Sequence, residues 1–171
     1  MAERSDVPTT AEERTLLIER IFDAPRELVW KAWSDPAMVQ RWWGPKGFAA
    51  PAVEVDFRVG GKYLFAMQSP EFNNGEPIWS TGVYREIVPL ERIVCTDCFA
   101  DANGNVVPAT HYGMTEDFPL EMLVTVEFED IGGRTRMTLR HEGIPAGEMS
   151  EGAEAGWNES LDKLAESLVS A

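Results

Sequence analysis

The alternation of apolar and polar residues predicts a strand and then two short helices early in the chain. Residues 15–24 (TLLIERIFDA) have the composition of a strand, with Ile18 and Phe22 on the same face. Residues 25–34 (PRELVWKAWS) begin with a proline and repeat apolar residues four apart, which is typical of a helix. Residues 35–43 (DPAMVQRWW) predict a second short helix, which the following Gly-Pro pair ends.

Strand-like alternation then dominates the middle of the chain. Six segments carry it: residues 53–58, 62–68, 78–88, 91–99, 120–129 and 134–141. Glycine pairs at residues 60–61 and 132–133 fit tight hairpin turns. The clearest alternation runs from Leu120 to Phe128 and places both residues on the face expected to point inward. Because tight turns join antiparallel neighbours, these segments predict an antiparallel meander.

The chain ends in a predicted helix over residues 147–169. Trp157, Leu161, Leu164 and Leu168 are spaced four, three and four apart and form a single apolar stripe. Burying four such side chains stabilises the fold by about 6–12 kcal/mol. We therefore expect the helix to pack on the inward face of the sheet.

These elements together predict an α+β domain in which a curved antiparallel sheet wraps around a long C-terminal helix. The expected element order is β-α-α-β(about 6)-α. We expect one domain over residues 15–171, preceded by a disordered polar tail over residues 1–14.

Charge and composition exclude several classes of function. Acidic residues outnumber basic ones 29 to 15, which gives a net charge of −14 in 171 residues. This excess argues against nucleic acids and anionic membrane surfaces as partners. No apolar run approaches the ~20 residues that a membrane span needs, and residues 1–14 lack the core of a signal peptide. We expect a cytoplasmic protein.

Four stretches of the sequence, in order, resemble one known family. They are RIFDAPRELVWKAWSDPAMVQRWWGP, VEVDFRVGGKY, STGVYREIVPLERIV, and HEGIP before a Trp-bearing terminal helix. Over residues 15–170 they resemble the family named for the activator of heat-shock protein 90 ATPase, within the START-like or Bet v 1-like (SRPBCC) superfamily. The resemblance implies a helix-grip fold, with a cavity between the curved sheet, the two short helices and the terminal helix. Functions in the superfamily range from lipid carriage to co-chaperone activity in the stress response.

The residues themselves also indicate a cavity. The N-terminal half of the terminal helix carries small residues, which leave space beneath the sheet. The candidate ligand-binding residues are Trp42, Trp43, Tyr63, Phe65, Met67, Trp79, Met122, Val124, His141, Gly156, Trp157 and Ser160. The alternative is that the bulky rings meet in this gap and fill it. A dry void of ~300 Å³ would cost about 7 kcal/mol, so a large cavity should be occupied, hydrated or partly collapsed.

His141 is the best polar candidate, because its parity in the strand aims it toward the terminal helix. There it could anchor the polar end of a ligand or act as an acid or base; the alternative is a hydrogen-bonded structural histidine. His111 and Tyr112 lie in the long unpatterned segment 100–118 and could form a lid, or simply a surface loop.

Three charged strand residues, Arg85, Glu86 and Asp97, are reserve candidates because parity does not decide which face they occupy.

Cys95 and Cys98 have the C-x-x-C spacing but lie in a predicted strand, where residues three apart point to opposite faces. Redox pairs of this type use a helix N-terminus, and a zinc site would need two further ligands at a spacing that the two histidines do not have. We therefore expect no metal and no cofactor.

Three functions remain open. The leading hypothesis is binding of a small hydrophobic or aromatic ligand in the cavity. The second is a chaperone-activator-like protein-interaction module, for which a chaperone would be the partner. The third is a cyclase- or dehydratase-type enzyme; the lack of an assignable inward carboxylate pair favours a non-enzyme. Exposed strand edges and a Trp-rich corner are compatible with a homodimer.

Overall fold

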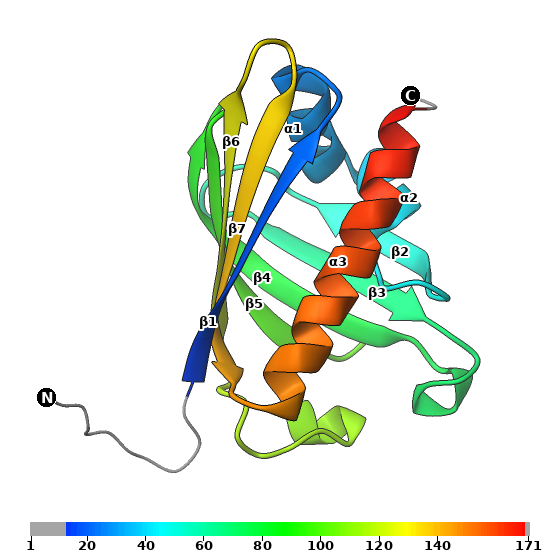
Figure 1. Ribbon diagram of the computed structural model, residues 1–171. Helices are drawn as coiled ribbons and strands as arrows, with labels where there is room; N and C mark the ends of the chain where they lie inside the picture. The colour runs from blue at the N-terminus through cyan, green and yellow to red at the C-terminus, as the bar shows by residue number, and fades with distance from the viewer. Residues whose placement is uncertain (1–12, 170–171) are drawn as a thin grey trace, which may run out of the picture.

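A computed structural model describes residues 13–169, which form a curved sheet with one long helix across its concave face (Figure 1). The strands are β1 (Glu13–Phe22), β2 (Ala49–Val55), β3 (Lys62–Gln68), β4 (Ile78–Val88), β5 (Arg92–Ala100), β6 (Met122–Asp130) and β7 (Thr135–Pro145). The α-helices are α1 (Arg26–Ser34), α2 (Pro36–Trp42) and α3 (Glu148–Val169). Short 3-10 helices lie at Asn73–Gly75 and Ala109–Tyr112. The predicted α+β helix-grip architecture is confirmed.

The sheet is antiparallel throughout, in the order β1-β7-β6-β5-β4-β3-β2. The six strands that follow α2 form the predicted meander, and β1 closes the sheet by pairing with β7. Ile18 and Phe22 of β1 are buried, whereas Leu17 on the other face is exposed. The strand begins at Glu13, two residues before the predicted start; the expected disordered tail otherwise falls outside the described residues.

The turn between α1 and α2 is fixed by its own sequence. The side chain of Asp35 accepts a hydrogen bond of 2.9 Å from the backbone N–H of Ala37, which caps α2. Pro36 follows at the first helical position, where it loses no hydrogen bond. Trp42 is fully buried at the end of α2, and its Nε1–H donates to the Ala32 carbonyl of α1 at 2.8 Å. The two helices therefore form one unit.

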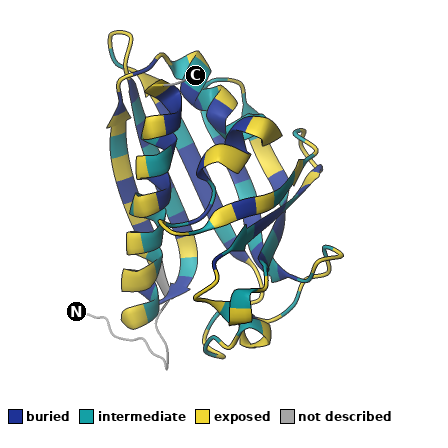
Figure 2. Cartoon of the chain, turned by 90° about the vertical axis from the view of Figure 1, so that its right-hand side faces the viewer, coloured by how far each residue is buried: buried dark blue, intermediate teal, exposed yellow. Residues whose placement is uncertain are grey.

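The terminal helix packs as its stripe predicts. Leu161, Leu164 and Leu168 are buried against the sheet, while the opposite face of α3 is exposed (Figure 2). Arg20 of β1 forms an ion pair of 2.7 Å with Asp162 and also reaches the Asn158 carbonyl. These contacts hold α3 beside the sheet edge.

A loop from Gly44 to Phe48 joins α2 to β2 and lies on α3. The Lys163 ammonium donates to the carbonyls of Gly44 at 2.9 Å and Phe48 at 3.0 Å. Partial burial lowers the pKa of Lys163. Pro45 of the same loop covers Gly156, where an added Cβ would lie 3.5 Å from the proline Cγ. The loop therefore covers α3 at Gly156.

One expected position is wrong. Leu120 is 57% exposed and precedes β6, which begins at Met122. The alternation does extend through Met122, Val124 and Val126, all of which are buried. Leu120 continues the pattern by sequence alone, because at this residue the chain is still in the long loop and has not yet joined the ladder of β6.

Candidate functional site

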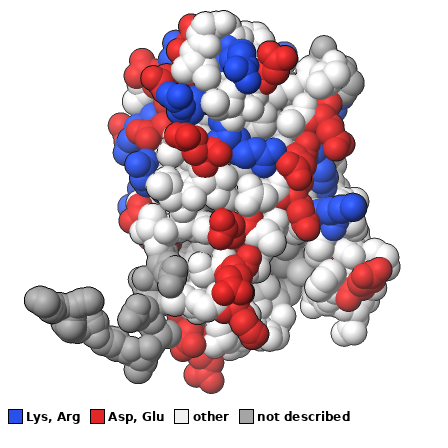
Figure 3. Space-filling view, viewed as in Figure 1, with Lys and Arg blue, Asp and Glu red and all other residues white. Residues whose placement is uncertain are grey.

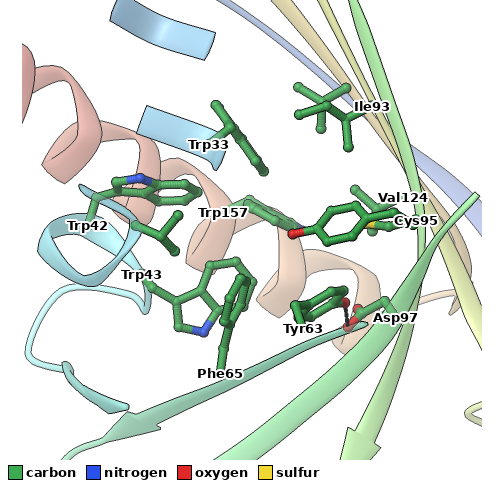
Figure 4. Close-up of a pocket in the computed structure, with 13 residues that line it drawn as sticks. Trp33, Trp42, Trp43, Tyr63, Phe65, Ile93, Cys95, Asp97, Val124 and Trp157 are labelled. Carbon is green, nitrogen blue, oxygen red and sulfur yellow. Dashed lines mark hydrogen bonds between the residues drawn. The ribbon is translucent and has the colours of Figure 1, made fainter. Parts of the chain in front are cut away.

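The structure encloses a cavity of about 40 Å³ between the concave face of the sheet and the three helices (Figure 4). At ~10–15 Å³ per water, the cavity has room for about three water molecules. It is therefore far smaller than the large void considered from the sequence, and the bulky rings fill most of the gap.

Aromatic rings form most of the cavity wall. Its aromatic lining residues are Trp33, Trp42, Trp43, Tyr63, Phe65, Tyr84 and Trp157. The ring of Trp157 stacks on Trp33 with centroids 6.1 Å apart and meets Trp43 edge to face at 5.8 Å. Trp43 in turn contacts Phe65 at 4.8 Å. The rings thus make a continuous wall from the helices to β3.

Tyr63 reaches the far side of the cavity because β4 has a glycine in its path. The Tyr63 hydroxyl donates a hydrogen bond of 2.8 Å to the carbonyl of Thr96 on β5, two strands away. A Cβ at Gly82 of β4 would lie 2.6 Å from Tyr63 Cε2 and 1.9 Å from the Thr96 oxygen, so only glycine fits there. Burial, followed by the nearby Asp97 carboxylate, raises the pKa of Tyr63 well above its usual value.

A chain of polar groups lies at this end of the cavity. The Tyr63 hydroxyl is also 3.3 Å from Asp97 Oδ1 (Figure 4). Asp97 Oδ2 is 3.0 Å from Nε2 of His141 on β7. The Nε1–H of Trp157 on α3 donates to His141 Nδ1 at 3.0 Å. Tyr63, Asp97, His141 and Trp157 therefore connect the sheet to the terminal helix, and we call them the polar chain.

The bond from Trp157 fixes the protonation state of His141. An indole N–H can only donate, so Nδ1 must accept and the imidazole is neutral, with its proton on Nε2. Although Nε2 lies close to Asp97, its N–H is not directed at the carboxylate, and it has no hydrogen-bond acceptor among residues 13–169. Trp33 Nε1 is a second buried donor without an acceptor in this part of the chain. Buried donors of this kind need an acceptor, which in proteins is commonly an ordered water molecule.

Six of the twelve predicted ligand-binding residues line the cavity. They are Trp42, Trp43, Tyr63, Phe65, Val124 and Trp157.

The other six residues lie elsewhere. Met67 is two residues beyond Phe65 on β3, where it pairs with Ile78 near the end of the hairpin. Trp79 follows on β4, opposite Ala66, and Met122 lies at the start of β6, opposite Asp97. These three positions are at or near strand ends, beyond the lining.

Gly156, Ser160 and His141 are also outside the lining, for different reasons. Pro45 covers Gly156, and the buried Ser160 hydroxyl donates to the Gly156 carbonyl within α3. His141 is 6% exposed and touches the cavity only through Asp97 and Trp157. The prediction that His141 points inward toward the terminal helix is confirmed, but the small residues do not create the cavity.

Sequence reasoning missed several lining residues. Those never assigned to the site are Trp33, Val39, Tyr84, Ile93, Cys95 and Val126, while Asp97 was a reserve candidate. The spacing of Val29 and Trp33 marks a buried helix face, and the parity of Val126 matches Val124, so two of these signals were available. The register shift between Tyr84 and Glu86 interrupts parity on β4, whereas the lining residues Ile93, Cys95 and Asp97 of β5 alternate regularly.

The other residues considered from the sequence lie in structural contacts or at the surface. Cys95 and Cys98 are free thiols, and burial raises the pKa of both, that of Cys98 to about 11. Such thiols are poor nucleophiles. Tyr112 donates to the Ala100 carbonyl and accepts from the Trp79 N–H, which fastens the long loop to the sheet, whereas His111 is exposed. Arg85 pairs with Glu121 at the surface.

Residues 13–169 contain no group of three or more His, Cys, Asp or Glu side chains placed to hold a metal ion. In the same range, no helix is both long and apolar enough to span a membrane.

The comparisons with known proteins identify relatives of this architecture. A structure from Chromobacterium violaceum is 32% identical, covers 89% of this chain and 94% of that one, and superposes with a TM-score of 0.72. An Arthrobacter aurescens protein is 28% identical, with coverage of 92% and 87% and a TM-score of 0.71. The AHSA1 protein from Silicibacter pomeroyi is 27% identical, with coverage of 91% and 98% and a TM-score of 0.72. A search of curated proteins gave no match.

The family comparison covers nearly the same part of the chain as these structures. Residues 23–168 match the family described as Activator of Hsp90 ATPase homolog 1-like protein. This range includes both short helices, β2 to β7 and almost all of α3. The resemblance expected from the four sequence stretches is thereby confirmed, and the chain belongs to the Activator of Hsp90 ATPase homolog 1-like family, within the START-like architecture.

Proposed function

We propose that the chain binds a small apolar or aromatic molecule in the cavity between the sheet and α3. The observation that carries this proposal is the composition of the wall, in which aromatic rings surround a space that Asp97 also lines. Rings supply contact area at little entropic cost, and a few polar groups orient the ligand, which is the usual design of small-molecule sites.

The size of the cavity sets a condition on the ligand. Space for about three waters accommodates only a few heavy atoms, so a complete aromatic ring requires wall side chains to move. Trp43 and Trp157 are half-buried and meet edge to face, whereas Trp42 is fully buried and its indole is held by the hydrogen bond to Ala32. We expect these two rings to separate when a ligand enters.

The test is a titration with single-ring aromatic compounds, followed by tryptophan fluorescence and calorimetry. Four of the six tryptophans line the cavity, so binding should change the emission. Val124→Phe places a ring inside the cavity and should abolish binding. Val59→Phe makes the same chemical change at an exposed hairpin position and should leave binding intact.

Two results would refute ligand binding at this site. One is the absence of any fluorescence or heat change across a series of single-ring compounds at millimolar concentration. The other is binding that survives Val124→Phe while the variant keeps the melting temperature of the wild type.

A second candidate function is an activator-like interaction with a chaperone, which the family membership favours. Acidic side chains gather along the exposed side of α3 and would suit a basic partner surface (Figure 3). The test is the ATPase rate of an Hsp90 chaperone with and without the chain. Stimulation that is lost in Glu151→Gln/Glu154→Gln but kept in Val124→Phe would assign this activity to the helix surface.

A further inference from the structure

The charge of the cavity differs from that of an ordinary apolar pocket, and this difference indicates what kind of molecule it takes. Asp97 is the one carboxylate in the lining, which contains no lysine, arginine or histidine. Its side chain is 19% exposed. No lysine or arginine among the described residues forms an ion pair with it.

The neighbours of Asp97 are neutral. The Tyr63 hydroxyl carries no charge, and burial raises the pKa of that hydroxyl further. His141 is neutral as long as Trp157 donates to Nδ1, so the imidazole cannot act as a counterion without breaking that bond. Within residues 13–169 the carboxylate therefore has hydrogen-bonding neighbours but no lysine or arginine paired with it, which is unfavourable at a largely buried position.

The aromatic wall supplies the complementary property. The faces of tryptophan and tyrosine rings attract cations, tryptophan most strongly. Four tryptophans line the same small space as Asp97 (Figure 4). The net charge of −14 also raises the local concentration of small cations around the protein.

Building on the proposed function, we infer that the ligand of this cavity is a small organic ammonium ion, such as an aromatic or short-chain amine. Its N–H groups would donate to Asp97, and its apolar part would lie against Trp43 and Trp157. The volume fits an ammonium group with a few carbon atoms, and a larger amine would use the movement of the two half-buried rings.

The experiment compares three ligands that share one ring and differ in charge: benzylamine, which is a cation at pH 7.5, benzyl alcohol and benzoate. Calorimetry on the full chain should show benzylammonium binding about tenfold or more tightly than benzyl alcohol, and benzoate not at all. Asp97→Asn keeps the shape of the side chain and should reduce the preference for the cation to within about twofold. Glu54→Gln makes the same change in net charge on the exposed face of β2 and should preserve the preference.

The outcomes separate this inference from the proposed function. If benzyl alcohol binds as tightly as benzylammonium and Val124→Phe abolishes both, the ligand site stands and the preference for a cation is wrong. If no compound binds, both proposals fail. A cation preference that survives in folded Asp97→Asn would also overturn the inference.

The wild-type series remains decisive if Asp97→Asn does not fold. In that case, NMR contacts between the benzylic protons and the indole protons of Trp43 or Trp157 must accompany cation-selective binding. Selective binding with contacts only to surface residues would overturn the inference.

Discussion

Two parts of the α3 interface show opposite relations between side-chain size and empty space. Around Gly156 the helix presents small residues, yet Pro45 and the loop after α2 approach and fill the volume. Around Trp157 the side chains are the largest in the protein, yet a cavity remains between them. A loop backbone can approach a small residue closely, whereas rigid planar rings meet at edges and leave gaps. Small residues therefore do not predict a cavity where a neighbouring loop can pack against them.

The largest effect on stability is expected when an aromatic ring of the cavity wall is removed. Trp42→Ala deletes a fully buried indole and its hydrogen bond to Ala32, so we expect the free energy of unfolding to fall by about 3–5 kcal/mol. Trp79→Ala is the matched control, because Trp79 is half-buried and outside the hydrophobic core cluster, and it should cost less than half as much. Urea denaturation measures both. Equal losses would show that the rings near the cavity are not the main support of the core.

High pH should affect the stability of the aromatic region around Trp157 differently from that of the region around Gly156. Burial raises the pKa of Tyr63, Tyr84 and Cys95 on the cavity side. A raised pKa means that the folded state keeps a proton which the unfolded chain releases. The contribution of each group to the free energy of unfolding is therefore fully present below its pKa in the unfolded chain and is lost as the pH rises from there through its folded pKa. We expect the free energy of unfolding to fall above about pH 9–10, by ~1.4 kcal/mol per pH unit for each group.

The control for this titration is Tyr84→Phe, which should reduce the slope by about one proton per molecule. The absorbance of tyrosinate should appear together with unfolding rather than before it. Early titration of all three tyrosines in a folded protein would contradict the burial of the cavity wall.

The sequence allowed the fold to be predicted more completely than the site. Alternation, glycine pairs and the leucine stripe each specify local structure, and local structure in this chain leaves one compact arrangement of sheet and helix. The cavity depends on distances between elements far apart in sequence. Trp33 was recognisable as part of a helix stripe, but nothing in the sequence shows that it faces Trp157. Asp97 alternates regularly with the lining residues Ile93 and Cys95 on β5, but both faces of this strand carry mixed residue types, so the sequence did not show which face points inward.

Loss of the hydrogen bonds from Lys163 to the loop after α2 should destabilise the fold moderately. Lys163→Met removes the ammonium that binds the carbonyls of Gly44 and Phe48, and we expect a loss of about 1–2 kcal/mol with faster hydrogen exchange in the loop. Burial lowers the pKa of this lysine, so keeping the ammonium charged in the folded state has a cost that its hydrogen bonds offset; this cost is absent above pH 10.5 and appears as the pH falls through the folded pKa. This dependence has the opposite sign to that of the tyrosines. If the exchange rates of the loop amides do not change in Lys163→Met, the hydrogen bonds from Lys163 are not what holds the loop over Gly156.

The smallest change in stability is expected at Gly156, and this variant compares the two parts of the α3 interface most directly. At Gly156 an added methyl group would lie at an ordinary contact distance of 3.5 Å from Pro45, and the helical backbone there needs no glycine. Gly156→Ala should therefore stabilise the fold by about 0.5–1 kcal/mol, as alanine generally does inside a helix. It should leave the binding of aromatic compounds unchanged, because Gly156 does not line the cavity. Calorimetric titration beside thermal unfolding measures both properties in one variant. If binding is lost while stability rises, ligands enter beneath the small residues after all, and the loop after α2 must open to admit them.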